Sequence, residues 1–430
     1  MAGFRVLIVG AGLNGLLAGL VLQRAGIDFV ILEMRNDTDL NWGSSVCLWP
    51  QSVRLLDQLG LLQEAHRLYL PVQKKCNLKR DGTVMSWSRM VENIGVYHGH
   101  PWMLFERRTL IQLLKGHIVS LSDHMFLNKK VTSIKSEQDN VEVECADGSS
   151  YTANILLGAD GVNGTARPFV EKTADKVDND FTTTFYGVYG HGGFLSSDLE
   201  HGVAYETHSN GFSSQLIVTS EEKYFFLVYQ KFDKSTQKRQ RITVEMEEEL
   251  VRKHGKVFLA PGVTLEQVWA NKTWKYSAPL EEGVTKKWSR QRVLLLGDAA
   301  HKMTPNIGFA VNAGWQSVVV LANMLQPYVA QNPGMSTKDL SKLFAEFHRT
   351  RRTQVRRDEQ LSALATRLAI WDSPLWRIVD QYVLPRINGD DVLAKYFCSW
   401  TVRKSVTLSF LPEPNFKEGL IKWDNKAVVR

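Results

Sequence analysis

The sequence predicts an α/β fold in which a Rossmann-type lobe is joined to a lobe built on a mixed β-sheet and to a helical C-terminal region. Residues 5–33 have the pattern of a strand, a glycine-rich turn, a helix and a second strand. Residues 180–290 contain alternating, aromatic-rich runs typical of a sheet, and residues 340–400 have the apolar periodicity of amphipathic helices. At 430 residues the chain exceeds the size at which one hydrophobic core keeps growing, so more than one lobe is expected.

The first lobe begins with a βαβ unit. An apolar strand at Val6–Val9 leads into a turn that carries Gly10, Gly12 and Gly15, and a helix and a second strand ending at Glu33 follow. Glycines at this spacing permit the tight turn, the approach of a pyrophosphate and a close helix–strand contact, while the helix N-terminus offers free N–H groups. Glu33 is placed to accept hydrogen bonds from ribose hydroxyls. The alternative is a glycine-rich turn beside a surface carboxylate, and the turn alone does not distinguish FAD from NAD.

The later segments return to each lobe in turn. Helical patterns occur at 53–62, 107–115 and 312–325, and strand patterns at 125–157, 216–219, 224–229 and 292–296. We therefore assign residues 1–75, 100–180 and 290–335 to the dinucleotide-binding lobe, residues 76–99 and 181–289 to a substrate-binding β-sheet lobe, and residues 336–430 to a C-terminal helical region.

Composition narrows the classes of partner. The net charge of +7 suits an anionic dinucleotide, but no dense Lys/Arg stripe with interleaved aromatic residues is present, so we expect no nucleic acid partner. The four cysteines are far apart and form no metal-ligand spacing, which predicts no metal site and a reducing compartment. The N-terminus has no signal-peptide pattern and no run reaches the length of a membrane span. We expect a cytoplasmic protein that is not secreted, with peripheral contact of the C-terminal helices to an intracellular membrane left open, as is the oligomeric state.

Two further motifs favour FAD. Leu157-Gly158-Ala159-Asp160-Gly161 follows one strand, and a segment that starts Gly297-Asp298-Ala299-Ala300-His301 and continues to Gly308 follows another. With the glycine-rich turn, these motifs occur in the order found in FAD-dependent monooxygenases of the p-hydroxybenzoate hydroxylase superfamily, which residues 5 to about 330 resemble. The runs Leu280-Glu281-Glu282-Gly283 and Lys286-Lys287-Trp288 look like the fungal branch that epoxidises prenyl chains in indole-diterpene and meroterpenoid pathways.

The resemblance implies roles for particular residues. Glu33 binds the adenosine ribose, Arg107 contacts the flavin phosphates or ribityl chain, and Asp298 meets the ribityl and pyrophosphate side. Asp160 supports the fold and the path of the reductant, although an aspartate that follows a strand is also a common helix N-cap, an alternative that applies to Asp298 too. The cofactor-binding residues expected in full are Gly10, Gly12, Gly15, Glu33, Cys47, Arg107, Asp160, Asp298, Gly308 and Val311. The implied partners are FAD, NADPH as reductant, O2, and a hydrophobic prenylated or polycyclic small molecule.

The sequence departs from the family where flavin chemistry occurs. The family's Gly-Gln-Gly-x-Asn loop reads Gly308-Phe309-Ala310-Val311-Asn312 here, so Ala310 lacks easy access to positive φ and Phe309 adds bulk. We expect a rearranged loop in which Phe309 packs against or into the isoalloxazine site, so that reduction by NADPH is slow or needs the substrate to trigger it.

The catalytic residues are also unusual. In the family an arginine normally precedes a strand of the substrate lobe, and the matching stretch here, which begins at Tyr186, lacks it. Tyr224 is the best positional match for a tyrosine that is proposed as catalytic in such proteins. Both tyrosines are therefore catalytic candidates, with a sheet-packing role as the alternative for Tyr224. The predicted activity is FAD-dependent epoxidation or hydroxylation. The alternatives are a redox-neutral isomerase or cyclase in which FAD is structural or absent, and a non-catalytic binding protein.

Overall fold

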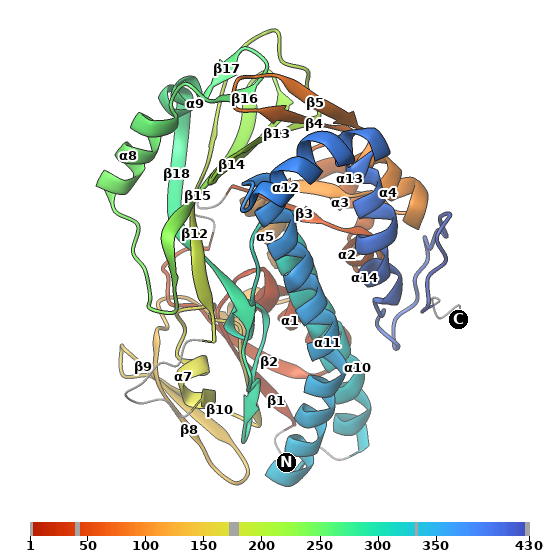
Figure 1. Cartoon of the computed structure of the whole chain (residues 1–430). Coiled ribbons are helices and arrows are strands. Elements are labelled where there is room, and N and C mark those ends of the chain that lie inside the picture. The colour runs from red at the N-terminus through yellow and green to blue at the C-terminus, as the bar shows by residue number, and fades with distance from the viewer. Residues whose placement is uncertain (1–2, 39–43, 172–179, 332–333, 426–430) are drawn as a thin grey trace.

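A computed structural model of the chain describes residues 3–38, 44–171, 180–331 and 334–425. Two large sheets meet at an angle, and two long helices run along one side of the molecule (Figure 1). This arrangement confirms the predicted α/β fold class with a Rossmann-type sheet and a mixed sheet.

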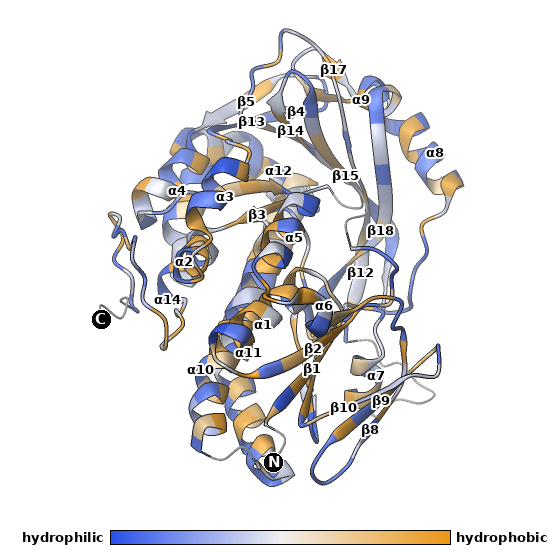
Figure 2. Cartoon of the chain, turned by 180° about the vertical axis from the view of Figure 1, so that it is seen from behind, coloured by the Kyte–Doolittle hydropathy of each residue, from blue (hydrophilic) through white to orange (hydrophobic). Residues whose placement is uncertain are grey.

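The first sheet has six strands and contains the βαβ unit. Its strands pair in parallel, except for β19, which is antiparallel to β20. In spatial order they are β19 (Ser289–Arg290), β20 (Val293–Leu295), β11 (Ile155–Gly158), β1 (Arg5–Val9), β2 (Asp28–Leu32) and β7 (Met125–Phe126). Strands β1 and β2 are hydrophobic along most of their length (Figure 2), as expected for parallel strands buried on both faces.

Helix α1 (Leu13–Arg24) follows β1 through the glycine turn. Gly10 has a φ of +100°, and a Cβ there would lie 2.6 Å from the carbonyl oxygen of Ala159; a Cβ on Gly15 would lie 1.9 Å from the carbonyl oxygen of Gly10. Both positions therefore require glycine. The turn brings the helix N-terminus to the carboxyl ends of β1 and β11.

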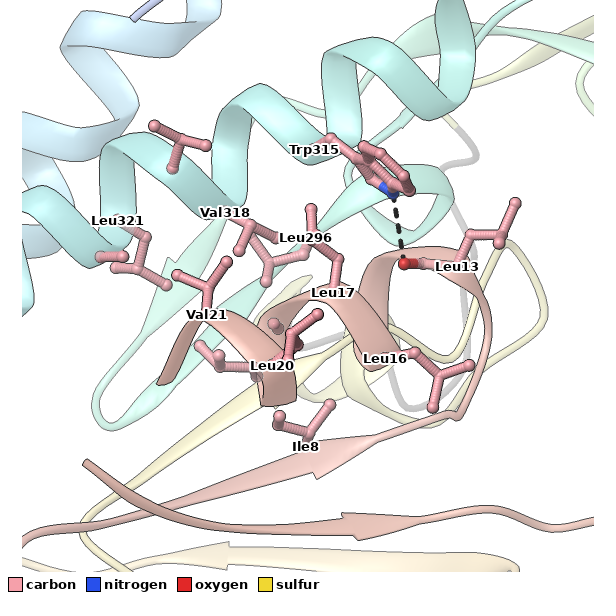
Figure 3. Packing of buried hydrophobic residues seen from close by; sticks show 14 of the residues in the cluster. Ile8, Leu13, Leu16, Leu17, Leu20, Val21, Leu296, Trp315, Val318 and Leu321 are labelled. Atoms are coloured by element: carbon pink, nitrogen blue, oxygen red, sulfur yellow. Dashed lines mark hydrogen bonds between the residues drawn. The ribbon is translucent and has the colours of Figure 1, made fainter. Parts of the chain in front are cut away.

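The core of this lobe lies between the sheet, α1 and α10 (Phe309–Gln331). Figure 3 shows Leu17 and Val21 of α1 facing Val318 and Leu321 of α10, and all four are buried. Each buried aliphatic side chain contributes roughly 1.5–3 kcal/mol. The indole Nε1 of Trp315 donates a hydrogen bond to the carbonyl oxygen of Leu13 (3.2 Å), which ties α10 to the start of α1.

The second sheet has eight strands and is mixed, because β13 pairs in parallel with β4. In spatial order the strands are β21 (His301–Lys302), β18 (Lys272–Val284), β12 (Thr182–Gly192), β15 (Lys223–Thr236), β14 (Phe212–Ser220), β13 (Val203–Ser209), β4 (Lys74–Lys79) and β5 (Val84–Ser88). Smaller sheets are formed by β8 (Val131–Ser136), β9 (Val141–Cys145) and β10 (Ser150–Ala153), by β3 (Ser45–Leu48) with β6 (Met103–Glu106), and by β16 (Phe258–Ala260) with β17 (Val263–Thr264).

The C-terminal region is helical and packs against α10 and the second sheet (Figure 1). Helix α11 (Thr337–Ala369) is capped by Ser336, whose hydroxyl accepts a hydrogen bond from the N–H of Asp339. Short helical segments follow: α12 (Pro374–Ile378), a π-helical turn at Val379–Val383, a 3-10 turn at Leu384–Ile387, α13 (Gly389–Val392), a second π-helical turn at Leu393–Cys398, and α14 (Ser399–Lys404). No helix within the described residues combines the length and apolar character needed to cross a bilayer.

The remaining helices are α2 (Pro50–Gln58), α3 (Leu62–Leu68), α4 (Met90–His98), α5 (Arg107–Gly116), α6 (Leu121–His124), α7 (Ala166–Glu171), α8 (Val244–His254), α9 (Leu265–Asn271) and the 3-10 turn Gly297–Ala299. The structure corrects two expected boundaries. The end of the strand pattern 125–157 is divided between β10 and β11, which belong to different sheets. Helix α10 begins at Phe309 instead of about 312.

Candidate flavin and substrate site

A cavity of about 530 Å³ lies between the two sheets and the C-terminal helices. It starts at the N-terminus of α1 and passes the loop that precedes α10. It ends against β13–β15, β4 and the helical segments after α11. Of the predicted site residues, those that line it are Gly12, Cys47, Arg107, Asp298, Gly308 and Val311.

The glycine turn forms the nucleotide end through Gly12, while Gly10, Gly15 and Glu33 do not line the cavity. Gly12 caps α1 and has no side chain to satisfy the free N–H groups of the first helical turn, which leaves them to an anion. The carboxylate of Glu33 accepts hydrogen bonds from the N–H of Ala11 (2.8 Å) and the N–H of Arg35 (3.0 Å). Glu33 is therefore held beside the turn at the end of β2, with further lone pairs free for ribose hydroxyls.

The carboxamide of Asn14 lies next to the Gly-Asp motif. A Cβ on Gly297 would lie 1.9 Å from Nδ2 of Asn14, and a Cβ on Gly314 would lie 2.3 Å from its Oδ1, so glycine is needed at both contacts. The Oδ1 atom is buried and finds no donor among the described residues, although Asn14 lines the cavity. A buried acceptor without a donor fits a cofactor that carries hydroxyl groups.

Charged groups line the cavity beyond Asn14. Oδ2 of Asp298 accepts a hydrogen bond from Nζ of Lys302 at 2.5 Å. Lys302, with His301 and Arg107 nearby, lowers the pKa of Asp298 although burial acts to raise it, so the carboxylate is ionised. Burial lowers the pKa of Arg107, while Asp298 opposes that shift. The guanidinium of Arg107, which lines the same cavity as the N-terminus of α1, fits a pyrophosphate.

Asp160 is not at the N-cap position that was the alternative for it, because α7 begins at Ala166, but its side chain bonds the start of that helix. Its Oδ2 accepts a hydrogen bond from the N–H of Ala166 (3.0 Å), at the first residue of α7. Ala159 and Gly161 line the cavity but Asp160 does not, so the geometry gives its side chain no contact with a cofactor in the cavity. Burial is the largest cause of its raised pKa.

The loop before α10 is held by Asn312. Its Oδ1 accepts a hydrogen bond from the N–H of Trp49 (2.9 Å), and its Nδ2 donates to the carbonyl oxygens of Cys47 (3.0 Å) and Gly308 (2.7 Å). The indole of Trp49 donates to the carbonyl oxygen of Ile307 (2.8 Å). These bonds fasten the loop to β3.

Gly308 and Cys47 are in close contact within this loop. Gly308 has a φ of +66°, and a Cβ on it would lie 1.9 Å from Sγ of Cys47, so the residue must be glycine for two reasons. Burial raises the pKa of the Cys47 thiol to about 12. The thiol is therefore neutral at physiological pH.

The expectation for Phe309 is wrong. Its ring is fully buried in the core of the first lobe and packs edge-on against Trp49 with a ring-centre distance of 4.9 Å, while Ala310 and Val311 line the cavity. Positive φ is taken by Gly308, and α10 begins one residue later. Ala310 therefore needs no left-handed conformation, and the substitution does not strain the loop.

The expectations for Tyr186 and Tyr224 are also wrong. Both side chains lie in a second core, on the face of the sheet that packs against α8 and α9, and neither lines the cavity. The hydroxyl of Tyr224 donates to the carbonyl oxygen of Val268 in α9 (3.0 Å), and Tyr186 packs against Phe232. Tyr224 therefore has the structural, sheet-packing role that was the alternative for it.

Sequence reasoning missed the residues of the sheet that do line the cavity. Tyr189 of β12 lines it, and burial together with Asp298 raises the pKa of its phenol. Glu206 and His208 of β13 also line it. The signal for these two was available, because two ionisable residues at positions i and i+2 of a strand point to the same face.

The described residues thus fit FAD: free N–H groups and cations for the pyrophosphate, a carboxylate for the ribose, and a buried acceptor beside them. A sequence profile described as an FAD binding domain matches residues 4–333. The FAD-dependent monooxygenase srdH of Neurospora crassa is 30% identical over 451 residues, covering 99% of this chain and 100% of the relative. The FAD-dependent monooxygenase ausM of Penicillium brasilianum is 29% identical over 427 residues, covering 95% and 88%.

Solved structures share the fold. p-Nitrophenol 4-monooxygenase PnpA from Pseudomonas putida has a TM-score of 0.74 at 19% identity, covering 94% of this chain and 98% of that one. HpxO of Klebsiella pneumoniae, solved with FAD and uric acid, has a TM-score of 0.72 at 20% identity, covering 91% and 97%.

The chain therefore belongs to the FAD binding domain family. It is an FAD-dependent monooxygenase of the p-hydroxybenzoate hydroxylase type, in the fungal branch that its sequence resembles. The redox-neutral interpretation is thereby set aside in favour of an oxidoreductase.

Proposed function

We propose that the protein uses NADPH to reduce bound FAD and transfers one atom of O2 to an electron-rich double bond or aromatic ring of a hydrophobic, prenylated or polycyclic small molecule. The observation that carries this proposal is the continuity of the cavity. One end is the FAD cradle of Gly12, Asn14 and Arg107, and the other end is lined by side chains of the second sheet and the C-terminal helices. A substrate in the second part would contact the flavin directly.

The second part of the cavity suits an apolar substrate. Its apolar lining comes from Met85, Trp87, Met90, Val91, Ile217, Phe225, Leu227, Leu384 and Leu393. Such a surface favours prenyl chains and fused rings because their burial releases ordered water. It also keeps the reacting centre dry, which limits the loss of activated oxygen as hydrogen peroxide.

The overall reaction balances with one substrate, NADPH, a proton and O2 giving the oxygenated product, NADP+ and water. Bound FAD supplies the step from hydride to activated oxygen. The protein's own groups bind and orient: Glu33 and the α1 N-terminus hold the nucleotide, Asn312 fixes the loop beside the ring site, and the apolar lining positions the substrate. Both epoxidation of an alkene and hydroxylation of a ring are consistent with this arrangement.

The test is a labelling experiment on the purified holoenzyme. Farnesylhydroquinone is incubated with NADPH under 18O2, and in parallel under 16O2 in H2 18O. We expect one labelled atom in the product only from 18O2, with NADPH consumed faster than NADH. Label from water, or protein that purifies without FAD and takes up none, would contradict the proposal.

We further propose that the C-terminal segments contact an anionic phospholipid surface. Leu375, Ile378 and Tyr382 are exposed and lie three and four residues apart, which places them on one helical face. Arg377 and Arg386 belong to the same segments and would complement anionic headgroups. Leu384 and Pro385 of this region line the cavity, so an apolar substrate could enter from the bilayer.

Vesicle sedimentation tests the membrane proposal. The Leu375→Ser, Ile378→Ser variant should lose binding to vesicles of phosphatidylcholine and phosphatidylserine, because burial of its apolar side chains in the interface is removed. Val119→Ser changes an exposed valine of the other lobe and should bind as the wild type does. Equal binding by all three proteins would exclude this surface as the contact.

A further inference from the structure

Five ionisable side chains, three of them buried and two partly buried, form a cluster at the substrate end of the cavity. Nζ of Lys75 in β4 lies 2.6 Å from Oε2 of Glu206 and 2.8 Å from Oδ1 of Asp390, and these ion pairs join β13 to α13. His208 of β13 lies 2.8 Å from Asp380 in the π-helical turn after α12. All five line the cavity, so the cluster forms part of its wall.

The imidazole of His208 is fixed at one nitrogen. Nδ1 shares its hydrogen bond with Oδ2 of Asp380, and the same oxygen accepts a hydrogen bond from Nε1 of Trp371 (2.7 Å). Since Asp380 accepts from the indole, Nδ1 of His208 carries the proton in the bond between them. The ring cannot turn without breaking this bond.

The other nitrogen of His208 lacks a comparable partner. Nε2 lies 3.8 Å from Oε2 of Glu206, beyond hydrogen-bond distance, and it is buried with no hydrogen-bond partner among the described residues. The neighbouring carboxylates raise the pKa of His208 to about 10 against the effect of burial, so Nε2 carries a proton at neutral pH. A buried cationic N–H on a ring that lines the cavity is available to a ligand.

A second polar atom of the cluster is unsatisfied. Asn77 of β4 donates through Nδ2 to Asp390 (2.6 Å) and to Ser86 (3.0 Å), which leaves Oδ1 as its acceptor. Oδ1 is buried and finds no donor in the described part of the chain, and Asn77 lines the cavity. One unsatisfied donor and one unsatisfied acceptor are the two groups that a hydroxyl can satisfy.

The charges of the cluster favour a neutral ligand. Lys75 and protonated His208 are opposed by the carboxylates of Glu206, Asp380 and Asp390, so an anionic oxygen would meet an excess of negative charge. Two neighbouring amide residues of the wall are engaged elsewhere, because Gln215 donates to the carbonyl oxygen of Asn306 (3.0 Å) and Asn306 donates to Glu206 (3.4 Å). His208 and Asn77 are thus distinguished from the rest of the wall.

We propose that Nε2–H of His208 and Oδ1 of Asn77 bind a neutral hydroxyl group of the substrate, which fixes the position of the apolar remainder along the cavity. This inference rests on the proposed function and specifies it: the substrate is hydrophobic with a hydroxyl at the end remote from the flavin. His208 acts as a positioning residue, and Asp380 holds it in place.

The test compares farnesol with farnesene on the FAD-loaded protein, with binding followed by the change in the flavin spectrum. One hydrogen bond to a charged donor predicts that the wild type prefers the alcohol by roughly 10- to 100-fold. In His208→Asn the amide keeps a donor for Asp380 but loses the donor for the cavity. Farnesol affinity should therefore fall by more than farnesene affinity, and the preference should fall toward one. His208→Gln places an amide N–H near the position of Nε2 and should restore part of the preference.

The outcomes separate the inference from the proposed function. If neither compound binds the wild type, the hydrophobic substrate class fails, and the inference fails with it. If both bind equally well, the substrate class stands and the hydroxyl site is excluded. A loss of farnesene binding in His208→Asn equal to the loss of farnesol binding would show a structural role only.

Discussion

The hydrogen bonds of Asn312 provide a direct test of how the flavin loop is held. The side chain makes three hydrogen bonds to backbone groups of Trp49, Cys47 and Gly308, and it is buried. Replacing Asn312 with Ala removes all three and leaves the N–H of Trp49 and two carbonyl oxygens without this partner. The hydrogen bonds from the indole of Trp49 to Ile307 and from the thiol of Cys47 to Gly308 would then remain between this segment and the loop.

The magnitude follows from these bonds. Each buried hydrogen bond contributes about 1 kcal/mol, and a buried N–H left without a partner costs about 1–3 kcal/mol. Partial entry of water reduces the sum, so we expect Asn312→Ala to destabilise the protein by about 3 kcal/mol. The loop lines the cavity, and its loosening should weaken FAD binding by about tenfold, or roughly 1.4 kcal/mol.

The assay needs a control on the same helix. Asn323 also bonds backbone groups through its carboxamide, to Thr407 (2.8 Å) and Ser409 (2.9 Å), but it does not line the cavity. Thermal unfolding of the apoprotein and FAD titration by fluorescence quenching are measured for both alanine variants. Asn323→Ala should lose some stability and keep the FAD affinity of the wild type. If Asn312→Ala also keeps that affinity, the loop does not depend on Asn312 and the reasoning is refuted.

Three further predictions concern single positions. Glu33→Ala should weaken FAD binding by about 1–3 kcal/mol through loss of charge-assisted hydrogen bonds, as measured by calorimetry, and an unchanged Kd would argue against the ribose role. Phe309→Gln should lower the free energy of unfolding by about 3–5 kcal/mol, because the ring packs in the core against Trp49, and it should not speed NADPH oxidation. Faster NADPH oxidation at an unchanged melting temperature would instead indicate that Phe309 blocks the site of the isoalloxazine ring. The pKa of His208 is raised from 6.5 to about 10, so its contribution to stability is complete below pH 6.5 and is lost as the pH rises through about 10. Melting curves across that range should show a smaller alkaline loss for His208→Asn than for the wild type, and identical curves would count against the ion pair with Asp380.

The nucleotide half of the site was predictable because local rules decide it. A positive φ at Gly10, the close contact at Gly15 and a carboxylate at the end of the second strand each follow from a few neighbouring residues. The positive φ of Gly297 in the Gly-Asp motif is local as well, but its contact with Asn14, like that of Gly10 with Ala159, joins segments far apart in the sequence. Local backbone requirements were therefore enough to identify the motifs, while their packing partners were not visible in the sequence pattern.

The prediction for the loop before α10 fails because it assumes that the family's second glycine, which is Ala310 here, must have a left-handed conformation. In this chain Gly308 supplies the positive φ and helix geometry starts at Phe309, so Ala310 is in a conformation that suits alanine. The buried position of Phe309 depends on Trp49, which lies 260 residues earlier in the chain and whose contact no local pattern indicates.

The error over the tyrosines has a different origin, the parity of a β-strand. Successive side chains point to opposite faces, so a shift of one residue exchanges the cavity face for the other core. Tyr186 and Tyr224 lie on the far face, whereas Tyr189, an odd number of residues from Tyr186, faces the cavity. Sequence alternation identifies the two faces of a strand but not which one meets the flavin lobe. Which face meets the flavin lobe depends on segments far away in the sequence. His208, for example, is held on its face by a hydrogen bond to Asp380, 172 residues later. A catalytic or positioning group on such a sheet can therefore be assigned only once the elements that cover each face are known, and here the covering element is the C-terminal region, the part of the chain that lies beyond the FAD-binding profile.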